Sequence, residues 1–148
     1  MTFQTPDRPV GVTLDVFESE VLRLMGLHQY AEAYLLLERQ TNPSISNLFN
    51  MALCLYWSQE YTDCLLVLNR VDYKMPVYSF RQKVMSRRGQ RLLMKQMSKE
   101  SHLNPISEFY ANQFLDILKE SILRLKVDCL SALSNWSELL AGASQLSI

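Results

Sequence analysis

Glycine, proline and cysteine are scarce in this chain of 148 residues, which holds four, five and three of them respectively. So few glycines and prolines argue against collagen-like, linker-rich and turn-dense β architectures. No run reaches the ~18 apolar residues of a membrane-spanning helix, and the N-terminus lacks the basic and apolar segments of a signal peptide. Apolar residues make up 48% of the chain and charged residues 20%. This composition is typical of one globular domain and excludes disorder of the whole chain.

The cysteines, Cys54, Cys64 and Cys129, are odd in number, widely spaced and set among apolar residues. A secreted, disulfide-stabilised domain typically has an even and denser set. We therefore expect three reduced thiols that pack as small apolar side chains, and a cytoplasmic location.

The residue patterns of common catalytic and metal sites are missing as well. Neither His28 nor His102 has a second histidine at ligand spacing, which argues against a zinc site. Gly89 is a lone glycine in a helical pattern, not part of a phosphate-binding loop. Glu18 and Glu20 fall on different helix faces and do not form a general acid–base pair. We expect no enzymatic activity, no metal and no cofactor.

Apolar residues recur at the three- and four-residue spacing of amphipathic helices from Thr13 onward, after an extended lead-in over residues 1–12. Capping residues and prolines divide this pattern into seven segments. The expected helices begin at Thr13, Tyr30, Ile45, Glu60, Pro76, Asn104 and Asn135. The sixth is expected to reach about Leu133 and the last to end near Gly142. Since no segment reads as a convincing strand, the sequence predicts an all-α fold of about seven helices.

Residues 24–40 align with residues 55–71 at a shift of 31 positions. The aligned pairs are Tyr30 with Tyr61, Glu32 with Asp63, Ala33 with Cys64, and Leu37 with Leu68. A helix pair that repeats at about this period is typical of a helical solenoid.

This pattern resembles the tetratricopeptide repeat (TPR), a helix–turn–helix family of about 34 residues per repeat. In residues 45–73 the consensus positions of the family hold Leu48, Met51, Ala52, Leu55, Tyr61, Cys64, Leu68 and Val71. The first repeat, about 14–42, matches at Phe17, Leu24, Tyr30, Ala33 and Leu37, and departs at Glu20 and Val21. A third and poorer match covers 123–146, with Val127 and Leu130 in place.

The resemblance implies a single domain, a right-handed stack of antiparallel helix pairs. A non-repeat basic helix at about 76–99, and a long helix with a degenerate repeat at about 105–148, would interrupt or extend the stack. An unrelated helical bundle is the alternative.

In the resembled family, the first helix of each repeat lines a concave groove. Carried over by position, the candidate groove residues are Leu22, Met25, Phe49, Leu53, Tyr56 and Trp57. Aromatic anchors such as Phe49, Tyr56 and Trp57 are the usual energetic centre of a protein-binding surface. The alternative is that the segments at 76–120 cover these side chains. Only Asn50 matches the lysines and asparagines with which one TPR subclass binds a C-terminal carboxylate, so we do not expect that activity.

The net charge of zero hides a strong asymmetry, because residues 73–99 hold eight basic residues and no acidic one. Five of these residues stand four apart and would line one helix face: Lys83, Arg87, Arg91, Lys95 and Lys99. Leu92, on the opposite side, would face the stack. This basic stripe is either a solvated face, a docking surface for an acidic protein, or a contact for an anionic membrane or nucleic acid.

These observations favour a non-enzymatic protein–protein interaction module, a small TPR-like adaptor or chaperone that binds a peptide or helix of a partner protein in its groove. We expect no small-molecule substrate, and neither a membrane nor a nucleic acid as main partner. The first alternative is a structural or self-associating subunit of a larger assembly, such as a secretion system, because the segment SELLAGASQLSI holds a single charge. A minor alternative is nucleic-acid binding through residues 74–99.

Overall fold

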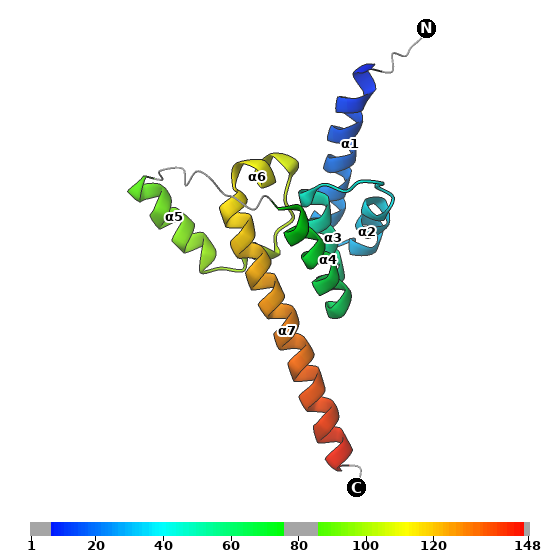
Figure 1. Ribbon diagram of the computed structural model, residues 1–148, viewed down its shortest axis with the longest axis vertical. Coiled ribbons are helices and arrows are strands. Elements are labelled where there is room, and N and C mark those ends of the chain that lie inside the picture. The colour runs from blue at the N-terminus through cyan, green and yellow to red at the C-terminus, as the bar shows by residue number, and fades with distance from the viewer. Residues whose placement is uncertain (1–6, 76–85, 147–148) are drawn as a thin grey trace.

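All regular structure in the described part of the chain is helical (Figure 1). The computed structural model describes residues 7–75 and 86–146, and the side chains of 16–75, 86–96, 98–135 and 140–141. The helices are α1 (Asp7–Gly26), α2 (Tyr30–Glu38), α3 (Ile45–Trp57), α4 (Tyr61–Lys74), α5 (Arg87–Met97), α6 (Glu108–Gln113) and α7 (Leu115–Leu146), and η1 (Ser101–Leu103) is a 3₁₀ turn. The predicted all-α class, with seven helices, is confirmed for these residues.

Helices α1 to α4 form two consecutive helical hairpins, and each helix packs on the next. Helix α3 is the centre of the core, because Ser46 and every residue from Leu48 to Cys54 are buried in it. The small residues Ala33 and Cys64, which the internal alignment pairs, are both fully buried in the second helix of their hairpins. Small side chains at these positions allow the helices to approach one another closely.

The internal repeat extends to the turns that join the two helices of each hairpin. His28 and Gln59, at the same position of each turn, have φ angles of 61° and 63°. In both turns the next N–H donates to the carbonyl five residues back at 2.9 Å, Gln29 to Leu24 and Glu60 to Leu55. A left-handed residue with this hydrogen bond is the Schellman motif that ends many helices. Residues that stand 31 positions apart in these two turns therefore have the same backbone conformation.

The predicted helix starts at Thr13 and Asn104 are wrong, since Asn104 is extended and α6 begins at Glu108. Helix α1 begins at Asp7 instead of Thr13, because Pro9 lies in the first turn, where the backbone N–H groups have no intrahelical partner and proline costs little. Helix α5 begins at Arg87, after the N-cap Ser86, whose side chain accepts from the Gly89 N–H. The expected start at Pro76 lies outside the described residues.

The predicted break before the last helix is also wrong, since α7 runs without interruption from Leu115 to Leu146. The chain instead breaks at Phe114, where φ is −125° and ψ is 49°. An asparagine within a helix costs less than about 1 kcal/mol, so Asn135 does not end it. Residues 123–146 therefore form no helical hairpin, and Val127 and Leu130 of the third match are exposed.

One side of α7 is buried at Leu118, Ile122, Leu125 and Cys129, and the helix packs against α4, η1 and α6. Beyond Cys129 none of the described side chains of α7 is buried. Figure 1 shows this second half extending away from the other helices. Within the described segments, no helix is both long enough and apolar enough to cross a bilayer.

Candidate functional site

The six candidate groove residues differ widely in exposure. Phe49 and Leu53 are completely buried, Met25 is 3% exposed, and Leu22 and Tyr56 are half-buried. Trp57, at the end of α3, is 44% exposed. A partner that contacted Phe49 or Leu53 would therefore have to replace the chain segments that cover them, whereas Trp57 is accessible as it stands.

The segment that lies against this face of α3 is the connection from η1 to α6, residues 103–107. Asn50, which is 2% exposed, forms two hydrogen bonds to Ile106. Its Nδ2 donates to the Ile106 carbonyl at 2.8 Å, and its Oδ1 accepts from the Ile106 N–H at 2.9 Å. Ile106 itself is 7% exposed. The chain thus places an extended piece of its own backbone on the inner face of α3.

Two further contacts hold the ends of this segment. Before it, His102 Nε2 lies 2.5 Å from the Asp128 carboxylate of α7, and His102 is buried. After it, the Glu108 N–H at the start of α6 donates to Glu18 Oε1 of α1 at 2.8 Å. The carboxylate of Glu18 thus ties the start of α6 to α1.

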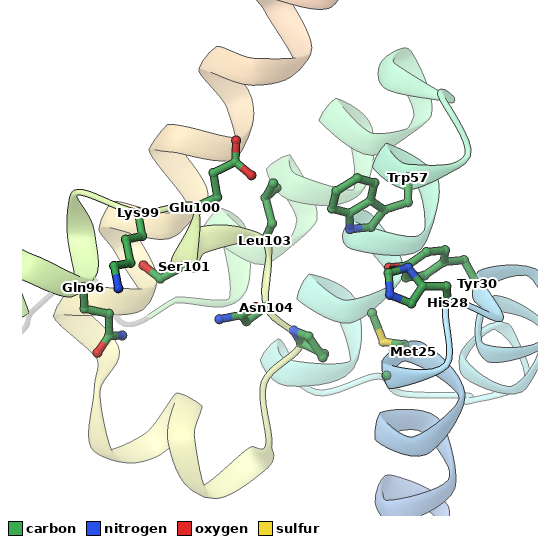
Figure 2. A pocket seen from close by; sticks show the side chains of 12 residues that line it. Met25, His28, Tyr30, Trp57, Gln96, Lys99, Glu100, Ser101, Leu103 and Asn104 are labelled. Atoms are coloured by element: carbon green, nitrogen blue, oxygen red, sulfur yellow. Dashed lines mark hydrogen bonds between the residues drawn. The ribbon is translucent and has the colours of Figure 1, made fainter.

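A cavity of about 600 Å³ lies between the first hairpin, the end of α3 and the η1 region. Figure 2 shows its two walls, with Met25, His28, Tyr30 and Trp57 on one side and Gln96, Lys99, Glu100, Ser101 and Leu103 on the other. The first wall is mostly aromatic and the second is polar and carries both signs of charge. Such a site can take an apolar or aromatic side chain at one wall and hydrogen-bonding groups at the other.

The aromatic wall belongs to a row of rings that joins both hairpin turns. Tyr30 stacks on Trp57 with 6.0 Å between the ring centroids and 14° between the planes. Tyr56 meets Trp57 edge-on at 5.4 Å and also contacts Tyr61. Partial burial raises the pKa of the Tyr30 and Tyr56 hydroxyls, so both stay neutral at physiological pH. The row holds Trp57 in a fixed orientation while its other side remains exposed.

A second cavity of about 290 Å³ also borders the 103–107 segment. Leu22 and Phe49 line it together with Pro105, Ile106 and Tyr110. Two of the candidate groove residues therefore line unfilled space even though a neighbouring segment covers them.

The basic stripe lies apart from these cavities, except at its end. Arg87, Arg91 and Lys95 are exposed on α5 and Lys99 follows it, while Lys83 lies outside the described residues. Lys99 lines the larger cavity, and its carbonyl accepts a hydrogen bond from Arg124 of α7. The expectation that Leu92 faces the helical stack is wrong, since this side chain is 62% exposed.

The three cysteines are free and buried, as predicted. Burial raises the pKa of the Cys54 thiol to about 12. A hydrogen bond with Cys129, together with burial, raises the pKa of Cys64. Among the residues that the structure describes, no three His, Cys, Asp or Glu side chains come together as a metal site would require.

Sequence reasoning missed the Asn50–Ile106 and His102–Asp128 pairs. The partners are 56 and 26 residues apart, so neither helical periodicity nor local motifs bring them together. Asn50 itself was a weak signal of the first pair, because an asparagine amid the apolar positions of α3 needs a hydrogen-bonding partner.

Comparison of the chain with protein-family models, with curated proteins and with solved structures finds no match in any of the three.

Proposed function

We propose that this chain is a non-enzymatic protein-interaction module of the tetratricopeptide type, in which the hairpins stack in a right-handed array and the face formed by α1 and α3 binds a peptide or helix of a partner protein. The observation that carries the proposal is the cavity of about 600 Å³ beside the exposed Trp57. The two equivalent Schellman turns support a repeat architecture. Three free, buried cysteines favour a reducing compartment such as the cytoplasm.

The aromatic wall explains how such a site would gain affinity. Tryptophan and tyrosine in well-packed pockets supply a large share of the binding energy at protein interfaces. Trp57 is already oriented by its stacking on Tyr30, so a partner would lose little free energy in ordering it. Lys99 and Glu100 at the opposite wall would orient the bound segment.

The test is a cross-linking pull-down from native lysate with the wild type, Trp57→Ala and Tyr73→Ala. Tyr73 is 92% exposed on α4, does not line the cavity, and serves as the matched aromatic control. A partner captured by the wild type and Tyr73→Ala, and lost with Trp57→Ala, is the expected result. Equal capture by all three would overturn the cavity as the binding site. Circular dichroism and light scattering check that each variant keeps its fold and mass.

A second candidate function is self-assembly through the outer face of α7. Leu123, Val127 and Leu130 recur at helical spacing on this face and are 59%, 59% and 57% exposed. An apolar stripe of this kind on a surface helix is typical of a helix–helix interface. Light scattering over a concentration series tests this candidate, with Val127→Glu against Thr62→Glu, a control at an exposed position of α4. A mass that exceeds the monomer and falls only in Val127→Glu would support it.

A further inference from the structure

We propose that residues 103–107 are an intramolecular ligand of the α1–α3 groove, and that a partner protein binds by replacing them with its own extended segment, in which a proline precedes an aliphatic residue. This inference rests on the proposed function and names the chemistry of the partner.

The Asn50–Ile106 pair recognises backbone, not side chain. One carboxamide both donates to and accepts from the backbone of a single residue, at 2.8 and 2.9 Å. Any extended segment with a free N–H at this position can make the same pair. Departure of the segment without a substitute would break both hydrogen bonds and expose Ile106 and the apolar side chains beside Asn50 to water. The pair therefore favours exchange of one segment for another over simple opening.

The sequence of residues 103–107 indicates which partner segments can take their place in the groove. Asn104 and Ser107 are extended, with ψ angles of 138° and 164°. Pro105 favours this conformation in the residue before it and reduces the entropy lost on binding. The Ile106 side chain is buried, and its N–H donates to Asn50. A competing segment thus needs a proline followed by an aliphatic residue that is not itself proline.

The chain's own segment fills the groove incompletely. The cavities of about 600 and 290 Å³ lie beside it, and Asn104 and Pro105 line both of them. Apolar side chains that entered this space would gain dispersion contacts with its walls. A partner segment with larger side chains at the positions of Ser101, Asn104 and Ser107 can make them. Since residues 103–107 lie outside α1 to α4, the exchange leaves both hairpins in place.

The test uses a fluorescein-labelled synthetic peptide with the sequence of residues 101–108, and fluorescence anisotropy. A tethered segment competes at an effective concentration of about millimolar, so the wild type should bind the peptide weakly. Ile106→Asp places a charge in the buried site and should release the segment. We expect this variant to bind the peptide at least about tenfold more tightly than the wild type, because the vacant fraction of the groove rises.

Three controls define the site. Glu108→Gln should bind like the wild type, because the Glu108 side chain is exposed and its contact with Glu18 is made by the backbone N–H. Asn50→Ala added to Ile106→Asp should remove the gain. A peptide with proline in place of the isoleucine lacks the N–H and should not bind.

The proposal is overturned if Ile106→Asp keeps the helical dichroism of the wild type and binds the peptide no more tightly, or if Asn50→Ala leaves the gain intact. If Ile106→Asp does not fold, the milder Ile106→Ala takes its place under the same criteria. The outcome is separable from that of the proposed function. Peptide binding without a Trp57-dependent partner would overturn the proposed function alone, and a Trp57-dependent partner without peptide binding would overturn this inference alone.

Discussion

His28 and Gln59 stand 31 residues apart and share a left-handed backbone conformation, each in the turn that ends the first helix of a hairpin. The left-handed region costs a residue with a Cβ atom about 1–2 kcal/mol, and glycine is the usual residue at this position. Both turns thus keep a residue that the backbone conformation alone disfavours.

Replacing Gln59 by glycine should therefore stabilise the protein. We expect Gln59→Gly to raise the free energy of unfolding by about 1 kcal/mol, because the relief of the left-handed strain exceeds the entropy that glycine loses on folding. Ser58→Gly is the matched control, since Ser58 has a φ of −89° and gains no relief. Urea unfolding followed by circular dichroism measures both. Equal changes in the two variants would contradict this account of the turn.

The buried Asn50 should contribute strongly to stability. Asn50→Ala leaves the N–H and the carbonyl of Ile106 without their partner, and we expect the free energy of unfolding to fall by about 2–3 kcal/mol. Asn47→Ala, on the same helix but half-buried, should change it by less than about 1 kcal/mol. If the two variants are equally stable by urea unfolding, the pair on Ile106 contributes little.

Local signals in the sequence predicted the helical hairpins well. The starts of α2 at Tyr30 and of α3 at Ile45 fall where the sequence placed them, because apolar spacing and the Asn42–Pro43 interruption act within a few residues. The repeat of 31 positions was also visible, since pairs such as Ala33 and Cys64 meet the same steric demand for a small side chain at a buried helix contact.

Other features depend on tertiary contacts that no local pattern encodes. Asn135 has the local sequence of an N-cap, yet α7 continues through it, because helix propagation costs less than a new start. The covering of Phe49 by the η1–α6 connection involves a hydrogen-bonding pair between residues 56 positions apart. The sequence predicts coverage by residues 76–120 as one alternative, and no local pattern within that range singles out the covering segment.

Alkaline pH should destabilise the fold through Cys54. Its pKa is about 12 in the folded chain against an ordinary value of 9.0. The folded state thus keeps a proton that the unfolded state releases above pH 9, and stability falls as the pH rises toward 12. Between pH 8 and pH 10.5 this group should remove about 2 kcal/mol from the free energy of unfolding.

Cys54→Ala isolates this effect. The variant starts from a lower stability at pH 8, because a buried side chain is shortened, but it should lose about 2 kcal/mol less between pH 8 and pH 10.5. Urea titrations at both pH values, with a reductant present, measure the difference. Parallel losses in the wild type and the variant would show that Cys54 does not titrate in the unfolded state as expected.

The two halves of α7 should differ in hydrogen exchange. Residues 118–129 contain four buried side chains against the body of the protein, whereas the described side chains beyond Cys129 are exposed or half-buried. An isolated helical segment of this length is marginally stable in water. Amides of residues 133–146 should therefore exchange on the order of 100-fold or more faster than those of residues 118–129. Residues 48–54 of α3 serve as the internal reference for full protection. Equal protection of both halves would contradict the exposure of the second half of α7. Protection of residues 133–146 that disappears on dilution would show that a second copy of the chain covers them, which favours self-assembly through α7.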